Sequence, residues 1–507
     1  MKSQLLAPLV AALLLCACNR EAPVAEPAPV EGKAAPAANT GGITPVDVPQ
    51  GYGYPGDRAT FQQWADDWNI DAITAAAWDL WGGMTSDSGQ VFEGHPLPVW
   101  ETWCGTEEAF AVGGCKTLSR PARAFERPAQ LHHMHRLRGA AAANGPADTA
   151  VVSFNKFNPA MANYLATKHA GPGAGSYDYT ASDSLAALNA AWPANTPVSS
   201  RKVEDAPYAA TGPNGGPGYS AMETKPVIFL VKASGLTAIP LWQGPSQSSA
   251  PKNAVPETWF TCVLLDPANP AGPDTAPVPA TPQQVAAAVP DTSLACKTYL
   301  YAPLSTIYAF PMDAESAAAF NADQAQGDGG LTAQAGDFGV LVAMHVNTKT
   351  LSNWTWQTFW WQPGGDTPDG FPGSKQGMTA KVQGSWRNYA MCSAWNQTKG
   401  NGSSEMVNCF NPFLETSVNI PAGQASNCVS CHGLATAGAI ASSGGQVNTM
   451  SYPLDYAKPI DFTGNPCVAG QCFESFTKTD FSWAIPGNAR PVAQPAAPAK
   501  PTAGAAD

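Results

Sequence analysis

Charge is scarce in this sequence, and positive charge is scarcer than negative charge. Only 13% of the 507 residues are charged, and 27 Lys and Arg stand against 39 Asp and Glu, for a formal net charge of −12. A protein that binds nucleic acid needs clustered basic residues, so the composition argues against a nucleic-acid partner. The sequence also lacks an internal repeat and, after its first residues, any apolar run long enough to span a membrane.

Proline and glycine are abundant instead, with 47 copies each, and tryptophan reaches 16. This composition is typical of a loop-rich exported protein. The N-terminus agrees, because Met1 and Lys2 form a short positive region ahead of an apolar run from Leu5 to Leu15. That run of about ten residues is too short to span a bilayer as a helix. We predict that residues 1–17 are a lipoprotein signal peptide.

The end of this segment, Leu15-Cys16-Ala17-Cys18, resembles the lipobox of bacterial lipoproteins. In a lipobox a small residue precedes the cysteine that is acylated, so Cys18 is the expected lipid attachment site. Two or three acyl chains would hold the protein on its membrane. Because Asn19 and not aspartate follows Cys18, we expect a periplasmic protein on the outer membrane in preference to the inner one, with the cell surface as an alternative. An ordinary signal-peptidase site is the other reading.

One short motif carries specific chemistry. In Asn427-Cys428-Val429-Ser430-Cys431-His432-Gly433, two residues separate the thiols and a histidine follows at once. The spacing matches the attachment site of a c-type haem, in which the thiols bind the two vinyl groups and the histidine ligates the iron. The alternatives are a structural disulfide, half of a zinc site or a redox dithiol, but neither a second pair of zinc ligands nor a βαβ context accompanies the motif. We expect one covalent haem c, with His432 as proximal ligand.

Composition divides the rest of the chain. Residues 18–50 and 488–507 are Pro/Ala-rich, which predicts an extended tether and a disordered tail. Between them we expect an α+β fold with a large antiparallel-sheet-rich body and peripheral helices over residues 51–410. Residues 411–487 are expected to form a short loop and helix segment that carries the haem and packs on the body.

Hydrophobic patterns predict the elements of the body. Apolar residues at three- and four-residue steps predict one helix from Phe61 to Trp81 that ends near Gly82-Gly83, and Val99 to Trp103 predicts a short strand. Runs rich in Val, Ile, Phe and Leu predict strands at residues 149–154, 225–233, 259–265 and 338–346. Helices are predicted at residues 159–169, 184–191, 282–288 and 313–325.

The cysteine count supports an oxidising compartment. Of 12 cysteines, removing Cys16, Cys18 and the two of the motif leaves 12 − 4 = 8. An even number of this size indicates disulfides and hence a periplasmic or surface location. Pairing neighbours in chain order would close four short loops, although the number alone leaves other connectivities open. The eight are Cys104, Cys115, Cys262, Cys296, Cys392, Cys409, Cys467 and Cys472.

Three of the seven histidines stand together in Leu131-His132-His133-Met134-His135-Arg136. On a strand, His133 and His135 would share a face and could chelate a metal ion. A polar surface strand is the interpretation that we favour, because no acidic residue with ligand spacing accompanies them.

The sixth ligand of the haem iron has two candidates. His345 ends an apolar run, and Trp354, Trp356 and Phe359 follow it and could form a wall for the porphyrin. A core histidine beside ordinary packing aromatics is the alternative interpretation. Met450 lies eighteen residues beyond His432, which at about 3.3 Å per residue is enough chain to pass around the porphyrin edge. An iron position that neither residue fills is the third case.

Several phrases of the chain resemble those of uncharacterised bacterial single-haem proteins called cytochrome c family proteins, which are exported. The phrases are Leu97 to Trp103, Thr237 to Trp242, His345 with Lys349-Thr350 and Trp354 to Phe359, Asn411-Pro412 with Leu414-Glu415, Ser426 to His432, and Asp480-Phe481-Ser482. The resemblance implies an exported haem protein and gives no substrate.

These observations favour a membrane-anchored periplasmic c-type cytochrome that transfers electrons between redox partners, either proteins or small molecules. A single covalent haem, a tether and the lack of a recognisable catalytic constellation support this reading. Two other classes stay open. One is a haem-dependent oxidoreductase that acts on peroxide, oxygen or a small organic substrate at an open iron face. The other is a haem-based sensor or structural surface lipoprotein.

Overall fold

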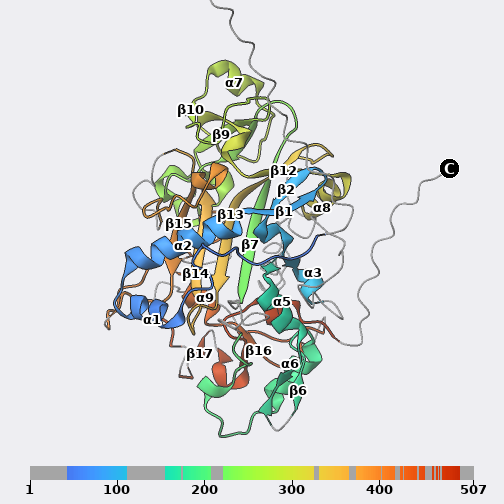
Figure 1. Cartoon of the computed structure of the whole chain (residues 1–507), viewed down its shortest axis with the longest axis vertical. Helices are drawn as coiled ribbons and strands as arrows, with labels where there is room; N and C mark the ends of the chain where they lie inside the picture. The colour runs from blue at the N-terminus through green and yellow to red at the C-terminus, as the bar shows by residue number, and fades with distance from the viewer. Residues whose placement is uncertain are drawn as a thin grey trace, which may run out of the picture. The chain divides into compact units, whose positions relative to one another are not determined.

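The computed structural model describes residues 43–110, 155–172, 175–206, 221–324, 331–364, 373–400, 402–416, 423–425, 427–441, 445–450, 459–461, 464–465, 467–468 and 471–491. They belong to one compact unit within residues 38–507, and Figure 1 shows their course. Four of the expected features lie outside the described residues: the signal peptide with Cys18, residues 18–42 of the tether, the 131–136 histidine cluster and the end of the tail from residue 492.

An antiparallel sheet forms the centre of the fold (Figure 1). Its strands follow the order β15-β14-β13-β7-β4-β3, and β12 also pairs with β13. The long strands are rich in branched and aromatic residues, which pack well on a pleated surface, and β14 is buried along its whole length. The strands are β3 Cys104–Gly105, β4 Lys156–Phe157, β7 Met222–Val231, β12 Ala309–Pro311, β13 Phe338–Thr348, β14 Thr355–Trp361 and β15 Tyr389–Ala394.

In the described part of the chain, the β structure also includes a smaller sheet and four two-stranded ladders. The smaller sheet has the order β10-β11-β9-β8, with β8 Thr237–Pro240, β9 Thr261–Asp266, β10 Val278–Pro279 and β11 Thr298–Pro303. In it β9 and β11 run parallel and the other pairs antiparallel. The two-stranded ladders are β1 Asp87–Phe92 with β2 His95–Pro98, β5 His169–Ala170 with β6 Ser176–Tyr177, β16 Thr436–Ala437 with β19 Thr477–Lys478, and β17 Cys467–Val468 with β18 Gln471–Cys472.

The helices are short and surround the sheets (Figure 1). They are α1 Arg58–Asp66, α2 Ile70–Met84, α3 Thr106–Ala109, α5 Pro159–Ala166, α6 Ser182–Ala190, α7 Pro282–Ala287, α8 Ala314–Gln324, α9 Cys428–His432 and α10 Ala484–Asn488. The α+β class with mostly antiparallel sheet is therefore confirmed. In the described part of the chain, no helix is both long enough and apolar enough to cross a membrane.

The register of the central sheet separates two sets of side chains. Lys225 of β7 lies opposite His345 of β13, and His345 lies opposite Thr358 of β14, so these residues share one face with Trp356. We call this the motif face, because the segment with the two thiols packs against it. Phe359 points to the opposite face, where its ring stacks on Trp81 of α2 at a centroid distance of 4.0 Å.

The predicted helix from Phe61 to Trp81 is wrong as a single element. It is divided between α1 and α2 at Trp68, which has a φ of +55°. The side chain of Asn69 then accepts a hydrogen bond from Ala72 N and caps the second helix. The apolar period continues across the break because Trp64, Trp68 and Ile73 share one small apolar cluster.

The glycines at residues 82 and 83 do not end α2, which continues to Met84. A Cβ on Gly82 would lie 3.0 Å from the Lys381 backbone, and one on Gly83 would lie 2.6 Å from the Val48 side chain. The two glycines therefore allow close packing of the helix against its neighbours.

The predicted strand from Val99 to Trp103 is also wrong, since residues Val99–Thr102 form a 3-10 helix, η1. All four of its side chains are buried, so no alternation between two faces could form. Thr102 Oγ1 donates to the Val99 carbonyl oxygen and fixes the turn.

The remaining predicted elements that fall on described residues exist, with shifted ends. The three predicted strands at residues 225–233, 259–265 and 338–346 correspond to β7, β9 and β13, and the four further helices correspond to α5, α6, α7 and α8. The strand predicted at residues 149–154 lies outside the described residues.

Disulfide bonds join Cys262 to Cys296, Cys392 to Cys409 and Cys467 to Cys472. All three join neighbours in chain order, which is one of the connectivities that the cysteine number left open. Cys104 is also disulfide-bonded, and Cys115 lies outside the described residues.

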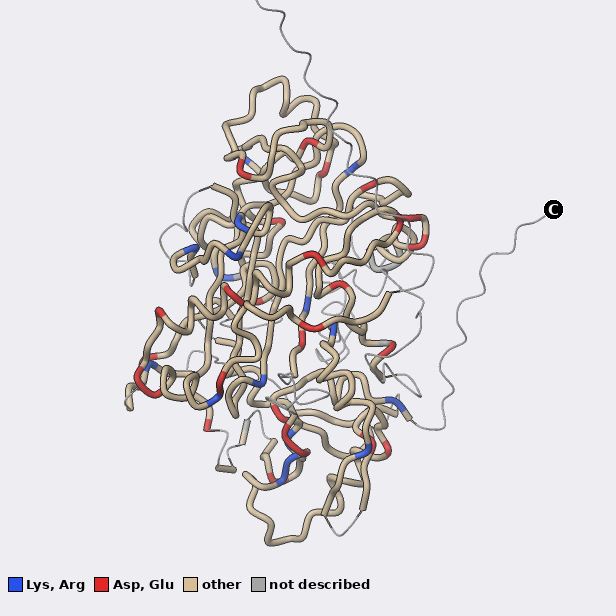
Figure 2. The backbone as a smooth tube through the Cα atoms, in the orientation of Figure 1, with Lys and Arg blue, Asp and Glu red and all other residues tan. Residues whose placement is uncertain are grey.

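Residues on both sides of the expected division at 410 and 411 share one core. Phe410, Phe413 and Val429 belong to the same buried cluster as the strands of the central sheet. Charged side chains are sparse along the described trace (Figure 2). Burying a charged side chain costs free energy unless a partner compensates it, so a group of buried charges requires specific partners.

Candidate haem-attachment site

The two thiols of the motif lie on one turn of α9. The Asn427 side chain begins this helix by accepting a hydrogen bond from Ser430 N, and its amide donates to the Asn396 and Gln397 carbonyl oxygens. Cys428 and Cys431 are three residues apart, so they project from neighbouring positions of the helix. Both are half-buried and neither forms a disulfide.

The His432 imidazole is oriented by a hydrogen bond to the backbone. Its Nδ1 lies 2.9 Å from the Phe481 carbonyl oxygen. A carbonyl oxygen can only accept, so Nδ1 carries the proton and Nε2 keeps a lone pair. Burial lowers the pKa of His432 to about 3, which keeps the imidazole neutral and able to act as a ligand. The Trp356 ring covers it at a centroid distance of 4.1 Å.

The carbonyl that orients His432 belongs to a strained turn. Asp480 and Phe481 have φ angles of +50° and +64°, a conformation that is uncommon for residues other than glycine. A buried ion pair holds the turn: Lys349 Nζ lies 2.5 Å from Asp480 Oδ1, and both side chains are at most 4% exposed. Asp480 Oδ2 also accepts from Ala206 N at 2.9 Å.

A second buried contact holds the same turn from the central sheet. Ser482 Oγ donates to Glu223 Oε1 at 2.6 Å, and burial raises the pKa of Glu223 to about 7. One residue later, Trp483 Nε1 donates to the Cys431 carbonyl oxygen at 3.3 Å. Residues 480–483, which we call the proximal turn, therefore connect the body of the protein to α9 at two points.

A polar group on the motif face lies near the thiols. His345 Nε2 and Glu415 Oε1 are 2.7 Å apart. Lys225 is the cross-strand neighbour of His345, and its pKa is lowered by burial. The pKa of His432 is further lowered by the charges of His345 and Lys225. Burial raises the pKa of the Cys428 thiol well above its usual range, and the Glu415 carboxylate adds to that increase.

The other predicted residues are divided between this site and more distant positions. Trp354 lies beside Trp356, with the ring centroids 6.1 Å apart. Phe359 faces α2 on the opposite side of the sheet. Met450 is fully buried in a small apolar cluster with Leu434 and Phe473. The structure thus brings His345, Trp354 and Trp356 to the motif face.

Sequence reasoning assigned no role to Lys225, Glu415, Lys349 or the Asp480-Phe481 pair. A signal was present for three of the four: Glu415, Lys349 and Asp480-Phe481-Ser482 all stand in the phrases that resemble the cytochrome c family proteins. No signal in the sequence pointed to Lys225, because one lysine in an apolar run does not change the prediction of a strand.

The residues of the site fit a covalent haem. Two thiols outside any disulfide share one helical turn, and an imidazole with a fixed tautomer presents Nε2. In the described ranges no three His, Cys, Asp or Glu side chains converge closely enough to hold a metal ion by themselves.

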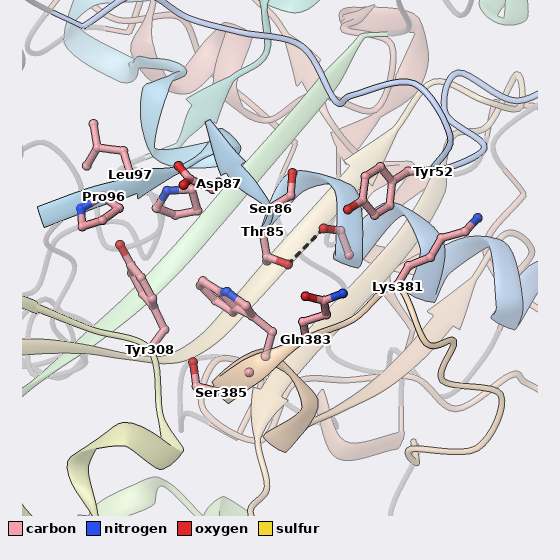
Figure 3. Close-up of a pocket in the computed structure, with 14 residues that line it drawn as sticks. Tyr52, Thr85, Ser86, Asp87, Pro96, Leu97, Tyr308, Lys381, Gln383 and Ser385 are labelled. Carbon is pink, nitrogen blue, oxygen red and sulfur yellow. Dashed lines mark hydrogen bonds between the residues drawn. The ribbon is translucent and has the colours of Figure 1, made fainter. Parts of the chain in front are cut away.

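A separate cavity of about 450 Å³ lies on the α2 side of the sheet. Figure 3 shows Tyr308, Asp87 and Gln383 among its lining residues. Other lining residues come from the end of α2, from the β1–β2 ladder and from the 3-10 helix Gly384–Asn388, η11. The residues that line it do not include the thiols or His432.

Comparison of the chain with protein-family models, with curated proteins and with solved structures found no match.

Proposed function

We propose that this chain is a single-haem c-type cytochrome of the kind named by the resemblance, and that it transfers electrons between redox partners. The observation that carries the proposal is the hydrogen bond from His432 Nδ1 to the Phe481 carbonyl oxygen, because it fixes the tautomer that a proximal haem ligand requires. Cys428 and Cys431 would bind the porphyrin. When bound, the haem would supply a one-electron carrier.

The surrounding residues have defined tasks in this proposal. Trp356 covers one side of the imidazole and excludes water, and the proximal turn holds the imidazole in its orientation. The Lys349–Asp480 ion pair acts through that turn as a positioning pair. The Phe359 ring stacks on Trp81 at the opposite face of the sheet and belongs to the packing of α2.

A haem-dependent oxidoreductase is the second candidate, and one observation favours it. His345 and Glu415 form a hydrogen-bonded imidazole–carboxylate pair on the motif face, an arrangement that can move a proton to or from a small molecule. Turnover with peroxide or a small organic substrate would select this candidate.

The first experiment tests attachment. The full chain is exported in cells with c-type haem maturation machinery, and covalent haem is stained on a denaturing gel. Wild type should stain, and Cys428→Ala and Cys431→Ala should stain weakly or not at all. The double variant Cys262→Ser/Cys296→Ser is the matched control, since it removes a disulfide of β9 in the smaller sheet and should stain like wild type. A colourless, correctly exported wild type would overturn the proposal.

The second experiment separates the carrier from the oxidoreductase. A low-spin haem that is reduced and reoxidised reversibly, without turnover of peroxide, supports electron transfer. A high-spin haem with turnover supports the second candidate.

Anchoring is part of the proposal. Cys18 would carry lipid and hold the protein on the periplasmic side of the outer membrane. Metabolic labelling with a fatty acid should mark wild type, and Cys18→Ala should release an unlabelled protein into the soluble periplasmic fraction. Labelling that persists in Cys18→Ala would contradict this assignment.

A further inference from the structure

The cavity on the α2 side of the sheet is not used by the proposed haem site. Its volume of about 450 Å³ lies within the range of about 300–1,000 Å³ that is typical of sites for small organic molecules. All of the residues that line it belong to the described part of the chain. The cavity is therefore a candidate second site, and the chemistry of its lining indicates which ligand it would bind.

One wall of the cavity is aromatic and is held in place by buried contacts. The Tyr308 and Trp386 rings are stacked, with a centroid distance of 4.5 Å and an angle of 21°. The Tyr308 hydroxyl donates to Glu101 Oε1 at 2.7 Å and lies 3.2 Å from His95 Nε2, and Glu101 is fully buried. Trp81 Nε1 donates to the Trp386 carbonyl oxygen at 3.2 Å. A wall that is already ordered loses little conformational entropy when a ligand binds, which favours affinity.

The cavity also presents free hydrogen-bonding groups. Within the described ranges, four of its side chains form no hydrogen bond through their polar groups: Tyr52, Gln383, Ser385 and Trp386. Asp87 uses Oδ1 in a turn of the chain, and its Oδ2 has no partner among the described residues. Together these groups can both donate hydrogen bonds to a ligand and accept hydrogen bonds from it.

The charges of the cavity argue against an anionic ligand. Lys381 is the only lysine or arginine among the lining residues, and its Nζ pairs with Asp79. Figure 3 shows that ammonium group pointing away from the other side chains drawn. A carboxylate or phosphate would therefore meet the Asp87 carboxylate without a free cation to offset the repulsion.

An organic cation matches the lining only in part. The Asp87 carboxylate and the aromatic rings would attract a cation. However, an ammonium group cannot accept a hydrogen bond. The indole NH of Trp386 and the NH₂ group of Gln383 would lose water without gaining a partner, which costs free energy.

A carbohydrate matches both features of the cavity. Its hydroxyl groups donate and accept, so they can pair with Gln383, Ser385 and Asp87. The C–H groups of a sugar ring can pack on the aromatic wall. We propose that the cavity binds one sugar unit of a neutral carbohydrate, with Tyr308 and Trp386 as the aromatic wall. The proposal does not depend on the haem.

Saturation-transfer NMR on the purified full chain tests the proposal, because this method detects weak ligands. The probes are neutral saccharides built from glucose, galactose, mannose, xylose or N-acetylglucosamine. Choline and acetate serve as the cationic and anionic controls. At least one saccharide should receive saturation from the protein, and neither control should. Titration of that saccharide then gives its dissociation constant.

Two variants assign the binding to this cavity. Gln383→Ala removes hydrogen-bonding groups from an exposed side chain, so the protein should fold normally and bind the saccharide about fivefold more weakly. Trp386→Leu removes part of the aromatic wall and should weaken binding about tenfold. Gln283→Ala, which changes an exposed glutamine of α7, is the matched control and should bind like wild type.

Three results would overturn the proposal. The first is a lack of saturation transfer to every saccharide, and the second is transfer to choline or acetate in place of the saccharides. The third is saccharide binding that stays unchanged in both Gln383→Ala and Trp386→Leu, because the ligand would then bind elsewhere on the protein. The attachment of haem is measured separately by staining on the gel, so either proposal can fail without the other.

Discussion

The Nδ1–H group of His432 donates to the carbonyl oxygen of Phe481 across 2.9 Å, and the two residues are 49 positions apart in the chain. The orientation of the motif histidine is thus set by the proximal turn and not by α9 itself. The buried contacts that hold the proximal turn therefore also influence the basicity and the orientation of the imidazole.

Breaking the buried pair under the turn should be costly. Asp480→Asn removes the carboxylate that faces Lys349, and leaving a buried charge unpaired typically costs about 3–5 kcal/mol of unfolding free energy. Urea unfolding should show a loss of this size. Lys399→Met is the matched control, because Lys399 and Glu405 are 50% and 65% exposed, and it should cost less than about 1 kcal/mol. Equal losses in the two variants would contradict the role of Asp480.

Stability should fall as the pH rises through neutrality. Burial raises the pKa of Glu223 from 4.5 to about 7, so the folded state holds its proton more tightly than the unfolded state does. The resulting stabilisation is fully present below about pH 4.5 and is lost as the pH passes about 7. A shift of this size corresponds to about 3 kcal/mol at most.

Glu223→Gln should reduce that pH dependence. Asp480, whose pKa burial raises to about 6, changes stability in the same direction and stays in the variant. Urea unfolding of both proteins at several pH values between 5 and 8 measures the difference. Parallel curves for wild type and variant would show that Glu223 is not responsible.

Trp356 and Phe359 should respond differently to substitution, although they belong to one strand. Trp356→Leu opens the side of His432 and should change the haem spectrum or reduction potential, whereas Phe359→Leu should leave both unchanged. Replacing a buried aromatic residue with alanine typically lowers the free energy of unfolding by about 3–5 kcal/mol, and each of these two leucine variants should lose less than that. Identical spectral changes in both variants would refute the division of the strand into two faces.

The Cys392–Cys409 disulfide should stabilise the segment that carries Glu415. It closes a separation of 17 residues, for which the chain-entropy model gives about 3 kcal/mol. Cys392→Ser/Cys409→Ser should lose about this amount in urea unfolding. Cys467→Ser/Cys472→Ser, with a separation of 5 residues, should lose about 2 kcal/mol. A larger loss from the shorter bridge would contradict the entropic account.

The sequence predicted those features that depend on neighbouring residues. β13 was predictable because a run of branched and aromatic residues favours a strand wherever it packs, and the thiol spacing of the motif is a local pattern. The spacing of apolar residues did not predict the break at Trp68. Both helices direct apolar residues into the same cluster, so the spacing continues across the break.

The surroundings of His432 could not be predicted for a different reason. Lys349 and Asp480 are 131 positions apart, and their pairing depends on how the C-terminal segment crosses the sheet. Lys225 reaches the site only through the register of β7 with β13, and a shift by one residue would turn it to the other face.

Because the residues of this site are far apart in the sequence, the site cannot be isolated as a short fragment. The residues around α9 come from four separate parts of the chain: Lys225, His345, Trp356 and the proximal turn. The surroundings of α9 are therefore not formed by residues adjacent to it in the sequence. A fragment restricted to residues 411–487 would lose the sheet that covers its thiols, and it should not serve as a transferable module in a fusion protein. Contacts between such distant residues also slow folding, so the site is completed only when the sheet and the C-terminal segment have come together.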